Sequence, residues 1–200
     1  MTAGETLTAH PQYDRISDAF DRFRRDGRFA PCTRTVFRCT HPKYARLPDF
    51  INGRGAMLNG GRWTSPSGEP TVYASTNPLV ALAETLAQRE RFGIPPTRFR
   101  TRVIRGINVE LSCIVDLSNG SIRQSLRVSL ARMTQCDWWT ENRAGREAIT
   151  QAIGRAAADA GVEGLLVPTA QSRRDANLAV FIERLRPGSR LEITDPTSAP

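Results

Sequence analysis

The stretch GRGAMLNGGRWTSPSGEPTVYASTNPLVALAE, from Gly53 to Glu84, is the most informative part of this chain. Two glycine pairs lead into Arg62, and a Pro-Ser-Gly turn leads into a short β-prone run containing Tyr73. Asn77-Pro78 then fits the cap and the first position of a helix that carries Glu84. Glycine permits backbone conformations and close approaches that other residues resist. We therefore expect a tight loop with Arg62 directed inward.

Two common nucleotide-binding loops do not fit this stretch. A dinucleotide fingerprint would need a third glycine where the chain has Leu58, and it would need a strand-then-helix context. A P-loop would need Gly-Lys followed by Ser or Thr, which does not occur here. On composition alone, a purely structural glycine-rich turn remains open.

The order of the motifs resembles the RES domain family. The matching features are GxGA, GGRW, a P-x-G turn, a strand ending in tyrosine, and a helical glutamate eleven residues after that tyrosine. This resemblance extends from about Arg38 to Asn177. It implies an α+β, ADP-ribosyltransferase-like single domain with a central, mostly antiparallel sheet and flanking helices. We divide the chain into an N-terminal extension with one amphipathic helix (1–34), a RES-like NAD-binding domain (35–194) and a disordered tail (195–200).

The resemblance also implies site residues. Arg38 and Glu84 correspond to the catalytic positions, and Arg62, Tyr73 and Thr169 to NAD-binding positions. Breaking the bond between nicotinamide and ribose builds positive charge at the sugar carbon, which a fixed carboxylate stabilises. Guanidinium groups bind a diphosphate in a planar, bidentate way. The tyrosine offers a ring for nicotinamide and a hydroxyl for its amide or for the ribose. Nicotinamide leaves as a neutral molecule, so no proton donor is required.

The chain departs from the family pattern at two positions. Thr64 follows GGRW where asparagine is usual, and Thr169 stands in Val-Pro-Thr-Ala where the family has serine. Threonine keeps the hydroxyl but adds a methyl group and stiffens χ1. Ser172 is the alternative to Thr169, in a polar loop three residues further on. We expect Thr169 to fill the role, because it follows a buried strand and is better preorganised.

Length and composition indicate one globular domain. The chain has 200 residues, of which 40% are hydrophobic and 24% charged, as in an ordinary soluble protein. It has no apolar run of about 20 residues and no signal-peptide pattern, so we expect a cytoplasmic protein without membrane association. Four scattered cysteines and two histidines predict neither a metal site nor a histidine-based triad.

The net charge of +8 raises the question of nucleic-acid binding. The arginines are scattered, however, and aromatic residues do not interleave with them as in a stacking platform. From the resemblance we expect an NAD-cleaving toxin, a glycohydrolase or phosphorylase, held by a helix-turn-helix antitoxin that alone reaches nucleic acid. The alternatives are a protein ADP-ribosyltransferase with the same site and, further off, a basic nucleic-acid-binding module.

Hydrophobic periodicity predicts the individual elements. Helices are expected at 14–25, 78–91, 121–133 and 143–160, with a loop at Trp138-Trp139. Strands are expected at 35–39, 71–74, 101–111, 114–117, 165–167, 178–182 and 190–193. The predicted core stripe of the 78–91 helix is Leu79, Leu82, Ala83 and Leu86. Arg38 should face solvent or a cleft if Phe37 faces the core.

Overall fold

One sheet forms the centre of the protein. The computed structural model describes residues 6–91, 93–95 and 101–194, so the predicted disordered tail lies outside the described residues. The sheet has the order β1-β2-β5-β4-β3-β6. Its strands are β1 (Ala30–Thr40), β2 (Thr71–Ser75), β3 (Val103–Asp116), β4 (Gly164–Pro168), β5 (Ala176–Phe181) and β6 (Arg190–Ile193). Within this sheet the β3–β4 pair is parallel and the other pairs are antiparallel. The expected α+β class with a mostly antiparallel sheet is confirmed.

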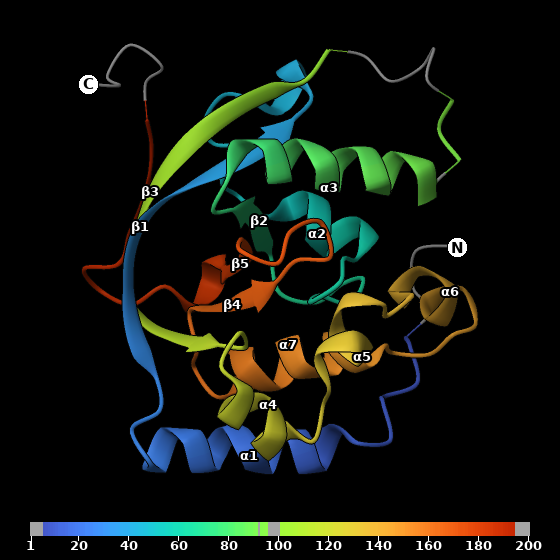
Figure 1. Cartoon of the computed structure of the whole chain (residues 1–200), viewed down its shortest axis with the longest axis vertical. Helices are drawn as coiled ribbons and strands as arrows, with labels where there is room; N and C mark the ends of the chain where they lie inside the picture. The colour runs from blue at the N-terminus through green and yellow to red at the C-terminus, as the bar shows by residue number, and fades with distance from the viewer. Residues whose placement is uncertain (1–5, 92, 96–100, 195–200) are drawn as a thin grey trace.

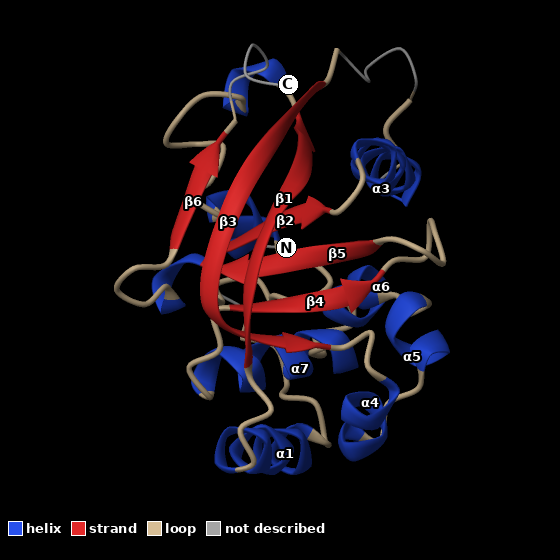
Figure 2. Cartoon of the chain, turned by 60° about the vertical axis from the view of Figure 1, so that its left-hand side comes forward, coloured by secondary structure: helices blue, strands red, loops and turns tan. Residues whose placement is uncertain are grey.

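The sheet closes on itself because β3 is long and bends. Its first part pairs with β1 from Val103 to Ile114, and its last residues pair with β4. Since β1 also pairs with β2, the pairings run through β2, β5, β4 and β3 back to β1. The sequence predicted two separate strands, at 101–111 and 114–117, where the structure has one continuous strand. Figure 2 shows β1 and β3 crossing the shorter strands as a long curved pair.

Helices lie on both sides of the sheet. They are α1 (Tyr13–Arg25), α2 (Arg54–Asn59), α3 (Pro78–Arg91), α4 (Gly120–Leu126), α5 (Leu130–Thr134), α6 (Trp138–Arg143) and α7 (Ile149–Asp159), with single 3₁₀ turns at Pro42–Tyr44 and Ile182–Arg184. Figure 1 shows α3 on one side, and α1, α4, α5 and α7 stacked on the other. This division places α3 apart from the main helical layer.

Two hydrophobic clusters hold these layers together. The larger one joins α1 and α7 to the sheet, with Phe20 and Ile153 fully buried beside Leu165 of β4. The second cluster includes Val36 and Ile107, which lie on the paired strands β1 and β3. Burying a side chain of this size stabilises the fold by about 1.5–3 kcal/mol. The predicted amphipathic helix α1 therefore shares a core with α7, whereas the domain boundary after residue 34 stays a prediction.

Three helical predictions need correction. The expected 121–133 helix breaks at Arg127, whose φ of 51° is left-handed, and Ser129 caps a new helix by accepting from Arg132 N. Trp138 begins α6, where a loop was expected, because the Asp137 side chain caps it. The last long helix begins at residue 149, not 143. Part of the glycine-rich loop is also helical, since α2 spans 54–59.

The orientation of α3 is the correction that matters for the site. Val80 and Ala81 are each only 6% exposed, whereas Leu79, in the predicted core stripe, is 72% exposed. Glu84 lies three and four residues after these buried positions and therefore shares their face. The helix turns the Glu84 carboxylate toward its partners on the sheet and leaves Leu79 outside, so the predicted core stripe is wrong at Leu79.

Candidate active site

Gln151 of α7 fastens the loop that carries Arg62. Its Nε2 donates to the carbonyl oxygens of Gly61 (3.0 Å) and Thr64 (3.3 Å). Its Oε1 accepts from the backbone N–H of Ala148, an otherwise unsatisfied donor at the start of the helix. Gln151 is fully buried, so these contacts hold the loop in one place. No motif or periodicity in the sequence marked this residue.

Tyr73 packs against the same loop from the β2 side. The backbone N–H of Trp63 donates to the Tyr73 hydroxyl at 3.0 Å. A Cβ at Gly61 would lie 2.7 Å from that hydroxyl oxygen, and Gly60 has a φ of 73°, so glycine is required at both positions. Burial raises the pKa of Tyr73 to about 12. The tyrosine hydroxyl thus holds the loop, and its predicted contact with nicotinamide stays a prediction.

Arg62 is anchored by part of its guanidinium. Nη1 donates to the carbonyl oxygens of Met133 (2.9 Å) and Cys136 (3.0 Å), at and just beyond the end of α5. Nε and Nη2 have no partner in the described part of the chain. Burial lowers the pKa of Arg62 and nearby Arg91 lowers it further, while Glu84 acts in the opposite sense. Arg62 is therefore a partly buried cation close to the predicted catalytic carboxylate, with donors to spare.

Arg38 points inward from β1. It shares a face with fully buried Val36, and Phe37 on the other face is half-buried. Nη1 donates to the carbonyl oxygen of Tyr73 at 3.0 Å, and the guanidinium lies 6.0 Å from the Phe50 ring centroid. Its buried Nε has no partner among the described residues. Burial lowers the pKa of Arg38, which leaves an enclosed cation with an unsatisfied donor.

The Glu84 carboxylate accepts hydrogen bonds from two side chains at the end of the sheet. Its Oε1 accepts from Thr169 Oγ1 at 2.6 Å and from Asn177 Nδ2 at 2.8 Å. Oε2 makes no hydrogen bond within the part of the chain that is described. Hydrogen bonds to an ionised group are short and strong, so the two donors fix the orientation of the carboxylate. One oxygen is held and the other is left for a ligand.

The donors to Glu84 are themselves held. Ser75 of β2 donates to Asn177 Oδ1 at 2.6 Å, and these two residues face each other in the β2–β5 pair. Thr169 Oγ1 accepts from the Gln171 backbone N–H at 3.0 Å. Ser172 donates instead to Asp175, at 2.6 Å, within its own loop. The structure thus brings Thr169 to Glu84 and keeps Ser172 away. Asn177, which the sequence reasoning assigned no role, completes the group.

The five predicted site residues are brought toward one another by different elements. β1 carries Arg38, the loop before β2 carries Arg62, β2 carries Tyr73, α3 carries Glu84, and the segment after β4 carries Thr169. The arrangement combines a fixed carboxylate with one buried and one partly buried guanidinium group, both of which retain donors. It suits an anionic ligand that also presents hydroxyl groups.

The described residues form neither a metal site nor a membrane span. Among the described residues, no group of three or more histidine, cysteine or acidic side chains is placed to hold a metal ion. In the same residues, no helix has the length and apolar character needed to cross a bilayer.

Comparison with known proteins gives a family and a fold. No curated protein matches the chain. One chain of the crystal structure of the M. tuberculosis MbcT–MbcA toxin–antitoxin complex matches it with a TM-score of 0.66 and 21% identity. The match covers 91% of this chain and 90% of that chain, and at this identity it shows the fold. The family model described as RES domain matches residues 35–199, so the chain belongs to the RES domain family.

Proposed function

We propose that this protein binds NAD and cleaves its bond between nicotinamide and ribose. The observation that carries the proposal is the Glu84 carboxylate, held through one oxygen by Thr169 and Asn177 and open at the other. The reaction develops positive charge on the ribose carbon. A preorganised carboxylate stabilises such charge without having to reorient during the reaction. The open Oε2 is suited to accept a hydrogen bond from a ribose hydroxyl.

The two arginines supply the binding of the diphosphate. Arg38 has a buried Nε without a partner, and Arg62 is anchored through Nη1 alone. A buried donor left unsatisfied costs about 1–3 kcal/mol, and an anionic oxygen would recover this cost. Guanidinium groups bind phosphate oxygens in bidentate fashion. Phosphate binding thus accounts for the unsatisfied donor of Arg38 and uses the donors that Arg62 has to spare.

The products identify the reaction. Pure protein is incubated with NAD, with and without inorganic phosphate, and nicotinamide and the ADP-ribose products are separated by chromatography. We expect nicotinamide release with free ADP-ribose for a glycohydrolase, or with a phosphorylated ADP-ribose for a phosphorylase. Transfer of ADP-ribose to a protein would identify the third acceptor class. If wild-type protein releases no nicotinamide under any of these conditions, the proposal fails.

Glu84→Gln tests the carboxylate itself. Glutamine keeps the shape of the side chain and loses its charge, so turnover should fall about 10²–10³-fold while the fold is retained. The matched control is Glu90→Gln on the exposed side of the same helix, where the carboxylate pairs with Arg89. Equal activity of the two variants would remove Glu84 from the mechanism.

We further propose that the protein acts as a toxin whose partner is an antitoxin, of the helix-turn-helix type implied by the family resemblance. The RES family membership and the toxin–antitoxin complex to which the matching structure belongs support this role. Induced expression in bacteria should stop growth and deplete NAD, and Glu84→Gln should relieve both effects. Growth arrest by the Glu84→Gln variant at equal expression would contradict it.

A further inference from the structure

A cavity lies beside the loop that carries Arg62, and its lining is separate from the predicted site residues. It has a volume of about 300 Å³, opens to solvent, and is lined by the 63–69 segment, α7 and the end of β5. Its lining includes none of Arg38, Arg62, Tyr73, Glu84 or Thr169. Ligand pockets in proteins measure about 300–1,000 Å³, so this cavity suits a ligand the size of one long side chain.

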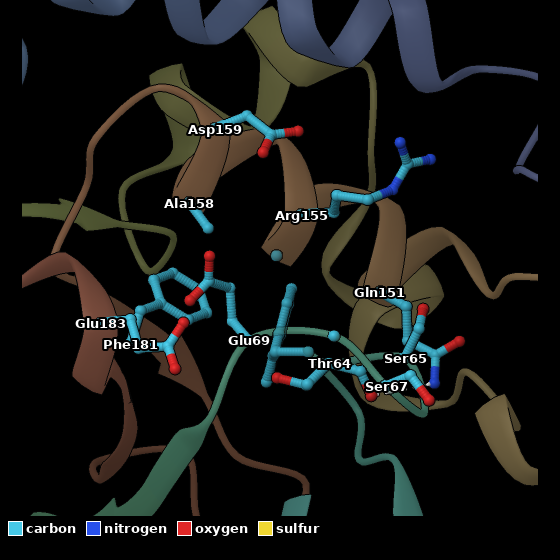
Figure 3. A pocket seen from close by; sticks show the side chains of 13 residues that line it. Thr64, Ser65, Ser67, Glu69, Gln151, Arg155, Ala158, Asp159, Phe181 and Glu183 are labelled. Atoms are coloured by element: carbon cyan, nitrogen blue, oxygen red, sulfur yellow. Dashed lines mark hydrogen bonds between the residues drawn. The ribbon is translucent and has the colours of Figure 1, made fainter. Parts of the chain in front are cut away.

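Carboxylates outnumber cations around this cavity. Glu69, Asp159 and Glu183 line it, and Arg155 is the basic residue in the lining. The Arg155 guanidinium is paired with Glu147, to which Nε and Nη2 donate at 2.8 and 2.7 Å. Figure 3 shows the Arg155 head group directed away from Glu69 and Glu183. Arg184 pairs with Glu69, and the Tyr13 hydroxyl donates to Asp159, so Glu183 is the lining carboxylate whose charge is not offset among the described residues.

Two polar atoms in the wall lack partners. Glu69 accepts from Arg184 Nε through Oε1 at 2.7 Å, but its buried Oε2 has no partner in the described residues. The hydroxyl of Ser65 is buried and equally unpaired among those residues. Glu183 is exposed and makes no ion pair there. A buried acceptor without a donor is costly, and a ligand with several N–H groups would satisfy it.

Aromatic side chains complete the pocket. Trp63 and Phe181 line it and are 2% and 1% exposed. Glu69 and Phe181 both line the pocket, as labelled in Figure 3. Aromatic faces attract ammonium and guanidinium groups, and the attraction is stronger where water is excluded. The carboxylates, the aromatic ring and the unpaired acceptors therefore all favour a cationic group with N–H donors.

We propose that this pocket binds a cationic group with several N–H donors, a guanidinium or an alkylammonium. Glu69 Oε2 and Ser65 Oγ accept its hydrogen bonds when their side chains rotate toward it, Glu183 supplies charge at the opening, and Phe181 contributes to the wall. Such a group occurs in free amines and in the basic side chains of proteins. The lining contains none of the proposed catalytic or NAD-binding residues, so binding here is measured without NAD.

The test is calorimetric titration of the full chain without NAD. The probes are spermidine as a free amine, Nα-acetylarginine amide as a protein-like side chain, and Nα-acetylcitrulline amide as its neutral isostere. Either cation should bind and raise the melting temperature, and citrulline should not. Binding by spermidine alone identifies a free amine, and binding by the arginine derivative identifies a protein side chain. Failure of both cations, or equal binding of the citrulline derivative, overturns the proposal.

Variants locate the binding. Glu69→Gln should weaken it by about tenfold or more, as expected for loss of a hydrogen bond to a charged group. Because Glu69 also pairs with Arg184, Glu183→Gln and Ser65→Ala serve as milder variants, and Glu183→Gln should weaken binding about 2–5-fold. Glu192→Gln on β6 is the matched control and should leave the affinity unchanged. Unchanged affinity in both milder variants would show that the cation binds elsewhere.

Discussion

Replacing Thr169 with valine removes one contact to Glu84 and little else. The Thr169 side chain is almost fully buried, its hydroxyl donates to Glu84 Oε1 at 2.6 Å, and valine has nearly the same shape. The hydroxyl also accepts a hydrogen bond from the Gln171 backbone N–H, but Gln171 is exposed and its N–H can donate to water instead. The substitution therefore isolates the hydrogen bond that orients the carboxylate.

The expected loss of NAD turnover in Thr169→Val follows from the strength of that hydrogen bond. A hydrogen bond to a charged group contributes about 1.5–3 kcal/mol, and each 1.36 kcal/mol is a factor of ten in rate. Turnover of NAD should fall about tenfold to a hundredfold, less than for Glu84→Gln, because Asn177 still holds the same oxygen. The assay is nicotinamide release, with kcat and KM determined separately and the melting temperature measured alongside.

Two companion variants distinguish the Thr169 hydroxyl from the Ser172 hydroxyl. Thr169→Ser keeps the hydroxyl and should retain activity. Ser172→Ala removes only the contacts of a hydroxyl that bonds Asp175 and Arg174 N in its own loop, and should be near neutral. Full activity of Thr169→Val together with loss of activity in Ser172→Ala would show that the loop serine carries the contact.

Three further predictions concern the arginines, the loop and Tyr73. Arg38→Ala and Arg62→Ala should each weaken NAD binding by about 1.5–3 kcal/mol, measured by calorimetry in a turnover-deficient background. The control variant Arg22→Ala, on α1, should have no effect. Equal losses of affinity in all three variants would indicate general electrostatics instead of a binding site. A Cβ at Gly154 would lie 1.8 Å from a carbonyl oxygen of the Arg62 loop, so Gly154→Ala should cost about 1–3 kcal/mol in chemical denaturation and lower activity; unchanged stability would contradict this packing. Because burial raises the pKa of Tyr73 from its usual 10 to about 12, its contribution to stability is complete below pH 10 and is lost between about pH 10 and 12. Urea unfolding across that range should show a shallower decline for Tyr73→Phe, and an identical slope would refute it.

The glycine-rich stretch shows how far a local pattern reaches. Gly60 and Gly61 were expected to permit a tight loop, and the structure requires glycine there for a left-handed turn and for the close approach of the Tyr73 ring. The position of the loop itself depends on Gln151, ninety residues away in the chain. A glycine pattern indicates that the backbone is closely approached, but the tertiary packing determines which group approaches it.

Arginine content illustrates the same limit. Several arginines donate to backbone carbonyls in distant segments: Arg15 to Leu126, Arg24 to Ala160, Arg105 to Ala45 and Arg186 to Gly161. Part of the basic composition that suggested nucleic-acid binding therefore serves the fold. Composition records the charge and not the partner that each guanidinium meets.

The sequence by itself determined the fold class, the order of the motifs and the elements that carry the predicted site residues. These features are local, because alternation marks strands, and a cap such as Asn77, which accepts from Leu79 N at 2.9 Å, marks a helix start. Only the tertiary structure decided which face of α3 is buried and which donors meet Glu84. Those donors lie 85 and 93 residues further along the chain. Helical spacing predicted which residues of α3 share a face. It could not predict the partners of Glu84, because these come from segments distant in the sequence.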